Sequence, residues 1–406
     1  MALWITAKPE VFSRREEEDK LLLLHPGQRG LPPLFLLGHP APLVWEAIGA
    51  GVQLGELLRR VEGKGIPSDA ALGTLSVLQR SGLVTCEPPL EAGDVQGAAA
   101  ADVLLDPWQY QFSRRCLKSP WYVLWEVTEA CPCRDECFYC YRPDTPFVEA
   151  GIGASTRIID EIVRSEVPFV TLLGGEPLCH RGIDDIIARL RSHRIYVKVI
   201  SNGVMVDEIV AGRLEAAGLN QIALSLDGLD QETSDASRGA GAFAAFRSAL
   251  AHLKARDLKI SISLTVSSAV FEQLDRLPAF CRDVGVDEVY FSPLRAVDRA
   301  RFPVGVSPLD FHQMARLHEV AEDLSRGPLN IVSLRECSCG RSSCVIHADG
   351  GVSPCPFGSG VFGNILEEDL GGIWSRMNDV ALRLEGSSTC FRHYDAPAEV
   401  SAAKQK

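Results

Sequence analysis

The sequence predicts an α/β protein built around a partial (β/α)6 TIM-like barrel, with a small winged-helix unit before it and a small metal-stapled module after it. Three observations carry this prediction. From Trp121 onward, apolar strand-like runs alternate six times with helical stretches, which is typical of parallel sheets and barrels. The region before it combines short strands with three helical stretches. Most of the 13 cysteines gather in two groups, near the start and after the end of the alternating region.

Length and composition limit the class of protein. The chain has 406 residues, of which 46% are hydrophobic and 23% charged, so it can bury a large core. The 53 acidic and 41 basic residues give a net charge of −12, which argues against nucleic acid or an anionic membrane as the main partner. No apolar run is long enough for a transmembrane helix, and the N-terminus lacks a signal-peptide core. We therefore expect a cytoplasmic protein.

The N-terminal domain is expected over residues 1–90. The apolar runs Leu21–Leu24 and Leu34–Leu37 predict two strands separated by a Pro/Gly turn. Helices are expected at 42–48, 54–61 and 68–81, and a short wing strand at 83–85. Residues 91–118 show little periodicity and carry Gly, Ala and Pro, so they are expected to form a linker.

The barrel domain is expected over residues 119–329. Strands are predicted near 121–127, 169–173, 195–200, 221–226, 259–265 and 288–291. Helices are predicted near 155–166, 182–193, 206–217, 242–256, 270–284 and 308–325. Six units fall short of the eight of a closed barrel, which favours a partial barrel, although an open doubly wound sheet shows the same periodicity. Residues 330–406 are rich in Cys and Gly and predict a small metal-stapled module, because so short a segment builds a poor core alone.

Three cysteines lie on one loop directly after the first barrel strand. They form Cys133-x3-Cys137-x2-Cys140, within EVTEACPCRDECFYCY. Three thiolates this close can hold three irons of a cubane cluster and leave the fourth iron without a protein ligand. A zinc knuckle with Cys131 as the fourth ligand is the alternative. The spacing therefore predicts a metal site and favours an iron–sulfur cluster.

This loop resembles the cluster loop of the radical SAM superfamily, and the resemblance spans residues of about 120–295. It implies that Cys133, Cys137 and Cys140 bind a [4Fe–4S] cluster whose open iron chelates S-adenosyl-L-methionine (SAM). In that family the reduced cluster cleaves SAM, and the resulting 5′-deoxyadenosyl radical abstracts hydrogen from the substrate. Tyr139 corresponds to the aromatic residue usually found before the third cysteine. The resemblance also implies an external electron donor such as flavodoxin or ferredoxin.

Further short motifs follow the second, third and fourth predicted strands. Gly174 and Gly175 follow the second strand, and glycine permits the backbone to approach a ligand closely. The resemblance implies that Glu176, the next residue, contacts the methionyl ammonium group of SAM. Arg238 suits the methionyl carboxylate through bidentate hydrogen bonding. Because barrel active sites lie at the carboxyl ends of the strands, we expect these residues to meet there. The resemblance assigns cofactor contacts to Tyr139, Gly174, Gly175, Glu176, Ser201, Asn202, Asp227 and Arg238.

A second cysteine group lies near the C-terminus and comprises Cys337, Cys339, Cys344, Cys355 and Cys390. With Gly350-x4-Cys355, it resembles the SPASM or shorter twitch module, which carries auxiliary [4Fe–4S] clusters. A full SPASM module has seven cysteines, including a Cys-x2-Cys-x5-Cys-x3-Cys run that this sequence lacks, so one auxiliary cluster is expected. Cys337, Cys355 and Cys390 fit best, the choice between Cys339 and Cys344 stays open, and structural zinc is the alternative for the group.

The N-terminal domain resembles the RiPP recognition element, a winged-helix module similar to PqqD, the chaperone of pyrroloquinoline quinone synthesis. In that family the leader of a ribosomal precursor peptide adds a strand to the exposed edge of the module. A DNA-binding winged helix is the alternative. It is opposed by the predicted third helix, on which only Arg80 is basic.

The motifs together predict a radical SAM maturase of ribosomally synthesised peptides. We expect it to bind the leader of a precursor peptide and to install an oxidative cross-link, a thioether or a carbon–carbon bond, in the core. One alternative is radical oxidation of a protein residue, as in sulfatase-maturing relatives, or of a small metabolite. Another is a non-catalytic, metal-stapled scaffold that binds peptides. No nucleic acid or membrane partner is expected.

Overall fold

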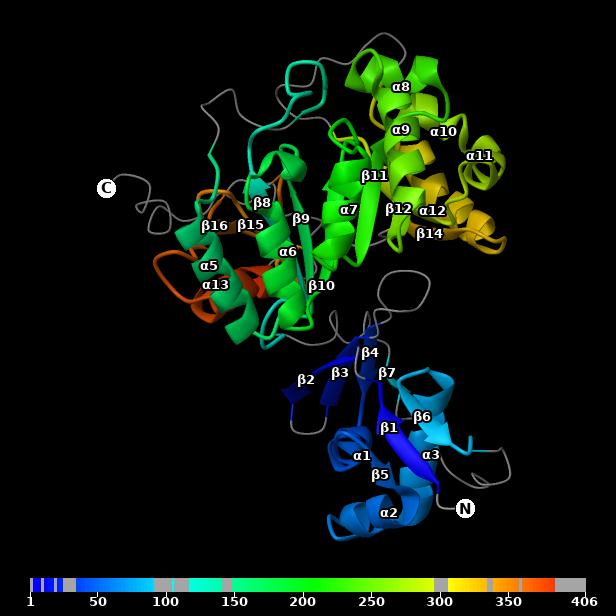
Figure 1. Ribbon diagram of the computed structural model, residues 1–406, viewed down its shortest axis with the longest axis vertical. Helices are drawn as coiled ribbons and strands as arrows, with labels where there is room; N and C mark the ends of the chain where they lie inside the picture. The colour runs from blue at the N-terminus through cyan, green and yellow to red at the C-terminus, as the bar shows by residue number, and fades with distance from the viewer. Residues whose placement is uncertain are drawn as a thin grey trace. The chain divides into compact units, whose positions relative to one another are not determined.

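The computed structural model forms two compact units, Met1–Lys118 and Ser119–Lys406 (Figure 1). It describes residues 3–8, 11–17, 20–24, 34–90, 104–105, 117–140, 148–295, 306–333, 339–357 and 360–383. Within these ranges, no helix has both the length and the apolar character needed to cross a membrane.

The N-terminal unit combines three helices with two small antiparallel sheets. The helices are α1 (Ala41–Ile48), α2 (Leu54–Glu62) and α3 (Ser68–Arg80), close to the expected ranges. One sheet has the order β2-β3-β4-β7, with β2 (Phe12–Glu17), β3 (Lys20–Leu24), β4 (Leu34–Leu37) and β7 (Leu104–Leu105). The other has the order β5-β1-β6, with β1 (Trp4–Ala7), β5 (Val52–Gln53) and β6 (Val84–Glu87). Apolar side chains from the helices and both sheets form one core, including Ile5, Leu23, Leu37, Leu57 and Leu75.

One edge of this unit carries a strand from a distant part of the chain. β7 lies within the segment expected to be a linker, yet it pairs antiparallel with β4, Leu36 opposite Leu105 and Leu37 opposite Leu104. β4 is therefore hydrogen-bonded on both sides, to β3 and to this added extended segment.

The second unit is organised by a ten-stranded sheet with the order β14-β13-β12-β11-β10-β9-β8-β15-β16-β17. Its parallel strands are β8 (Tyr122–Thr128), β9 (Phe169–Gly174), β10 (Tyr196–Ser201), β11 (Gln221–Leu226), β12 (Lys259–Val266), β13 (Glu288–Pro293) and β14 (Asn330–Ser333). The first six match the strands that the sequence predicts, in chain order, as a partial barrel requires. β14 adds a seventh parallel strand beside β13.

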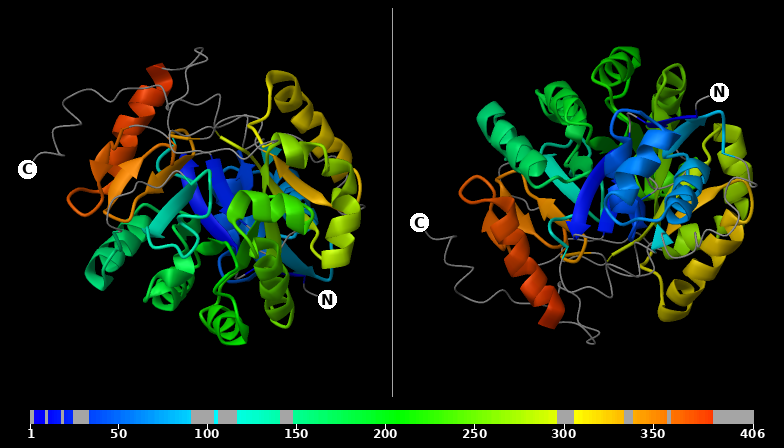
Figure 2. Two further views of the ribbon diagram at one scale, coloured as in Figure 1. Left: turned by 90° about the horizontal axis from the view of Figure 1, so that it is seen from above. Right: turned by 90° about the horizontal axis from the view of Figure 1, so that it is seen from below.

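The two faces of the parallel sheet differ in chemistry. Residues on the outer face, such as Val123, Leu172, Val199 and Leu264, are buried under helices, which ring the outside of the sheet in both views of Figure 2. The main helices are α5 (Ile152–Arg164), α6 (Ile183–Ser192), α7 (Glu208–Ala216), α8 (Gln231–Arg238), α9 (Ala242–Lys254), α10 (Ser268–Phe271), α11 (Leu277–Val284) and α12 (Phe311–Ser325). The inner face carries many polar side chains, among them Glu126, Thr171, Lys198, Gln221 and Glu288.

The C-terminal segment continues the same sheet. β15 (Ser343–Ile346) pairs parallel with β8, and β16 (Gly351–Ser353) and β17 (Gly363–Asn364) follow antiparallel. α13 (Leu370–Arg383) follows these strands, and it buries Ile373 and Trp374. The first barrel strand is thus hydrogen-bonded directly to the cysteine-rich module.

Candidate active site

The three-cysteine loop leaves the carboxyl end of β8 and is folded by its own backbone. The amide of Cys137 donates to the carbonyl of Cys133 at 3.0 Å, and the amide of Cys140 donates to the carbonyl of Cys137 at 3.1 Å. These turns bring the three cysteines onto one short loop, and all three remain partly exposed. The thiol of Cys131 donates to Cys133 and thereby lowers the pKa of the Cys133 thiol.

Two glycines at the end of β9 pack closely against the backbone that leads into this loop. The amide of Gly175 donates to the carbonyl of Thr128 at 2.7 Å, which ties β9 to the start of the loop. A Cβ atom on Gly174 would lie 2.2 Å from the carbonyl oxygen of Thr128, and one on Gly175 would lie 2.2 Å from that of Ala130. Any side chain at either position would therefore displace the backbone that leads into the cysteines.

Glu176 is a buried carboxylate held by neutral donors. It accepts hydrogen bonds from the Ser201 hydroxyl at 2.9 Å, the Asn202 amide at 2.8 Å and the Leu178 amide at 3.2 Å. Burial raises the pKa of Glu176 to about 7, and the three hydrogen bonds only partly offset this rise. A cationic ligand would stabilise the charged form of this group.

Asn202 connects the end of β10 to the cysteine loop. Its side-chain Nδ2 lies 3.6 Å from the sulfur of Cys133 and 3.7 Å from that of Cys131. Its backbone amide donates to Glu176. One residue therefore contacts both the buried carboxylate and the thiols.

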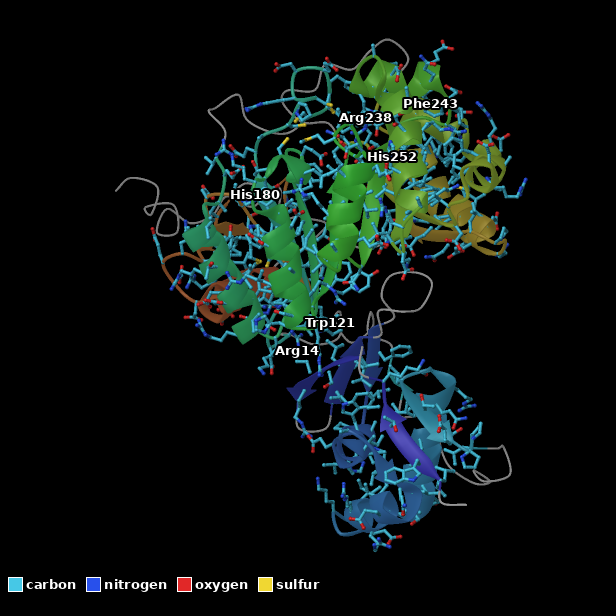
Figure 3. All side chains as sticks on the ribbon, in the orientation of Figure 1. Arg14, Trp121, His180, Arg238, Phe243 and His252 are labelled. Carbon is cyan, nitrogen blue, oxygen red and sulfur yellow. The ribbon has the colours of Figure 1, made fainter. Side chains whose placement is uncertain are left out.

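Arg238 completes the opposite side of the site, and Figure 3 labels it near the upper end of the sheet. Its Nε lies 3.0 Å from a carboxylate oxygen of Asp227, and its Nη2 donates to the Tyr139 hydroxyl at 2.7 Å. Although burial alone would lower the pKa of Arg238, Asp227 and the neighbouring Tyr139 and Cys137 raise it well above its ordinary value. The Tyr139 hydroxyl also lies 3.2 Å from the hydroxyl of Thr265 on β12. The loop is thereby attached to both flanks of the barrel mouth.

The residues present fit an iron–sulfur cluster and a SAM-like ligand. Three thiols share one loop, and backbone without a Cβ borders it at Gly174 and Gly175. In the described ranges, no three Cys, His, Asp or Glu side chains converge on one ion position. A cubane cluster does not require such convergence, since each thiolate binds a different iron. The buried carboxylate of Glu176 and the paired guanidinium of Arg238 offer opposite charges to an amino acid moiety.

The second cysteine group divides between the two faces of the sheet. Cys344 pairs with Val123 of β8 and is fully buried on the outer, helix-covered face, where burial raises the pKa of its thiol to about 12. Cys339 bridges to Ser343, which pairs with Tyr122 of the inner face. Cys355 follows Ser353, which pairs with Val345 of the same inner face. Cys337 and Cys390 lie outside the described residues.

A hydrogen-bonded chain that sequence reasoning missed joins the barrel to this module. His347 Nδ1 lies 2.6 Å from a carboxylate oxygen of Glu126 on β8, and its Nε2 lies 2.8 Å from the Ser353 hydroxyl. The Ser353 hydroxyl in turn donates to the carbonyl of Cys355 at 3.2 Å. A lone carboxylate within the apolar strand YVLWEVT was the sequence signal for Glu126.

Comparison with known proteins defines the family. A model of the radical SAM superfamily matches residues 125–272. Mycofactocin maturase MftC of Mycobacterium ulcerans is 31% identical over 263 residues, covering 59% of this chain and 69% of that protein. The chain belongs to the radical SAM superfamily. A model of the SPASM iron–sulfur cluster-binding domain matches residues 337–396, so this radical SAM enzyme also carries a SPASM domain.

Other similar proteins include an enzyme of a different pathway and a solved structure. The AdoMet-dependent heme synthase of Methanosarcina barkeri is 25% identical over 289 residues, covering 63% of this chain and 82% of that protein. The crystal structure of Streptococcus suis SuiB bound to precursor peptide SuiA covers 97% of this chain and 91% of that chain, with a TM-score of 0.65 and 15% identity. This similarity confirms the expected fold class.

Family membership confirms three predictions made from sequence. The protein is a radical SAM enzyme, and its cofactors include a [4Fe–4S] cluster and SAM. Its SPASM domain is an iron–sulfur cluster-binding domain. Membership of this enzyme family contradicts the alternative of a non-catalytic, metal-stapled scaffold.

Proposed function

We propose that this radical SAM enzyme is a peptide maturase that installs an oxidative cross-link, a thioether or a carbon–carbon bond, in a ribosomal precursor peptide. The observation that carries the peptide substrate is the addition of the extended segment β7 to β4 in the N-terminal unit. A leader peptide would be held by the same antiparallel pairing, in the place that β7 takes here. The relatives named as maturases, and SuiB solved with a precursor peptide, support the same substrate class.

The residues at the barrel mouth divide the work of holding the cofactors. Cys133, Cys137 and Cys140 would hold the cluster, which with bound SAM and an external donor such as flavodoxin or ferredoxin would supply radical chemistry at the barrel mouth. Glu176 accepts hydrogen bonds from the methionyl ammonium, and Arg238 donates to the methionyl carboxylate through its nitrogens not engaged by Asp227. The remaining assigned contacts, from Gly174, Gly175, Ser201 and Asn202, shape the backbone around the ligand.

We assign one auxiliary [4Fe–4S] cluster to Cys337, Cys339, Cys355 and Cys390. Cys339 is preferred to Cys344 because its backbone lies in register with the inner face, which also carries Ser353, whereas Cys344 packs on the opposite face. A cross-link removes two hydrogens from the peptide: one leaves as an atom, and the other as an electron and a proton. The four cysteines would hold an auxiliary cluster that can accept this electron, and the proton would pass to solvent or a side chain.

The test is anaerobic turnover of the loaded enzyme with SAM, a reductant and the precursor peptide encoded beside its gene. We expect 5′-deoxyadenosine, methionine and a peptide lighter by two hydrogens. An unchanged peptide mass with inverted stereochemistry would contradict cross-linking. Binding of the same leader to the full chain, measured by fluorescence anisotropy, tests the peptide assignment separately, and absence of binding would favour a protein or small-metabolite substrate.

A further inference from the structure

A lysine stands on the inner face of the barrel, below the residues that surround the cofactors. Lys198 lies in the middle of β10, three residues before Ser201, and only 4% of it is exposed. Its Nζ sits 3.1 Å from the centre of the Tyr290 ring on β13. Because β11 and β12 separate β10 from β13 in the sheet, this contact crosses the concave side of the barrel.

The other ionisable groups on this face have polar or charged partners. Lys259 Nζ lies 2.7 Å from a carboxylate oxygen of Glu288. Glu288 also accepts from the Tyr290 hydroxyl at 2.8 Å, from Asn330 at 3.1 Å and from Gln221. Higher on the same face, Glu126 is bonded to His347, and at the mouth Asp227 is paired with Arg238.

Lys198 differs from all of these groups. Among the described residues, no carboxylate lies within ion-pairing distance of its Nζ, and the face of Tyr290 is its one polar contact. The hydroxyl of Tyr290 is already committed to Glu288, so only the ring faces the ammonium.

At this level the described residues place Lys259 against Glu288 and leave Lys198 with no carboxylate in ion-pairing distance. Burial lowers the pKa of Lys198 to about 7, with Glu288 opposing and Lys259 adding to the effect. Burial of an ammonium without a counter-ion is unfavourable, and ionisable groups perturbed in this way cluster at functional sites.

We propose that Lys198 binds a carboxylate of the substrate on the inner face of the barrel. A carboxylate would supply the counter-ion that Lys198 lacks among the described residues, and it accepts hydrogen bonds from an ammonium. The proposal rests on the function proposed above, and it adds that the core of the peptide reaches this face. The carboxylate is then either the C-terminus of the peptide or an acidic side chain close to the modified residue.

The first test needs no peptide. In loaded enzyme with SAM present, sodium butyrate should raise the melting temperature of the wild type relative to sodium chloride of equal ionic strength. The Lys198→Met variant should lose this shift, while the exposed Lys254→Met variant should keep it. Without butyrate, Lys198→Met should melt higher than the wild type, because a residue of similar shape replaces a buried charge. Equal butyrate shifts in wild type and Lys198→Met, or no shift in either, would overturn the proposal.

The second test uses the precursor peptide. Lys198→Met should raise the KM for the peptide by about 10- to 100-fold, the loss expected for one charge-assisted hydrogen bond, and Lys198→Arg should recover part of it. A peptide amidated at its C-terminus, and peptides with single Glu→Gln or Asp→Asn changes, identify which carboxylate is bound. If the wild type modifies no peptide, the proposed function fails while the butyrate test still decides the site. A KM unaffected by Lys198→Met would contradict the assignment.

Discussion

Replacing Glu176 by Gln should remove a pH dependence that the structure builds into the cofactor site. Glu176 is fully surrounded by protein, and burial raises its pKa from the ordinary 4.5 to about 7, a shift worth about 3 kcal/mol. The folded protein therefore holds this proton more tightly than the unfolded chain does. Stability contributed by the protonated group is full below pH 4.5, falls as the pH rises from 4.5 to 7, and is level above 7.

The same group sets the pH dependence of SAM binding under the proposed assignment. Above pH 7 the methionyl ammonium meets a carboxylate, whereas below it the ligand must first displace a proton. The Kd for SAM should therefore rise by about tenfold for each pH unit below 7 in the wild type. Glu176→Gln should weaken SAM at pH 8 by about 10- to 100-fold, because one charge-assisted hydrogen bond is lost, and should flatten the profile.

The assay is equilibrium binding of SAM to the anaerobically loaded enzyme between pH 6 and 8.5 at constant ionic strength. Glu129→Gln, which changes a carboxylate closer to the surface of the same region, is the matched control and should keep the wild-type slope. A Glu176→Gln variant with the wild-type slope and affinity would refute the role of this carboxylate.

Three further predictions follow from the packing around the two cysteine groups. Gly175→Ala should lower SAM cleavage by about 100-fold, because its Cβ would collide with the Ala130 carbonyl and shift the cysteine loop; a normal rate would contradict the seating. Cys339→Ser should lose auxiliary-cluster iron by elemental analysis, whereas Cys344→Ser should retain it, and the reverse pattern would exchange their roles. His347→Leu should lower the free energy of unfolding by about 1–3 kcal/mol in denaturant titrations, with partial rescue by His347→Gln; no loss would show the chain to be dispensable.

The sequence predicts the barrel strands well because each strand is a mostly apolar run, as in FVTLLG of β9. It does not predict β2, whose sequence FSRREE is charged although Arg14 is buried. It also misses α8, since QETSDASR lacks an apolar stripe and is fixed instead by Asp230, which caps its N-terminus. In β2 tertiary contacts outweigh the local pattern, whereas in α8 a local capping hydrogen bond takes the place of an apolar stripe.

The candidate site also has parts that the sequence predicts and parts that only the structure shows. The Gly-Gly-Glu motif and Arg238 could be placed at the barrel mouth because they follow strand ends in order. The pairs of polar side chains on the inner face could not be predicted, because their members come from strands that are distant in the chain. Lys198 in YVKVIS had a sequence signal, a single charge within an apolar run, but only the structure shows that its ammonium faces the Tyr290 ring and no carboxylate of the described residues.

The most direct measurement is the destination of a hydrogen atom. The precursor peptide, labelled with deuterium at its carbon-bound positions, is turned over by the loaded enzyme with SAM and reductant. If the radical generated at the three-cysteine loop acts on the peptide, mass spectrometry will find 5′-deoxyadenosine that has gained one deuterium. SAM cleavage that yields only unlabelled 5′-deoxyadenosine, with the leader bound to the N-terminal unit, would contradict the account.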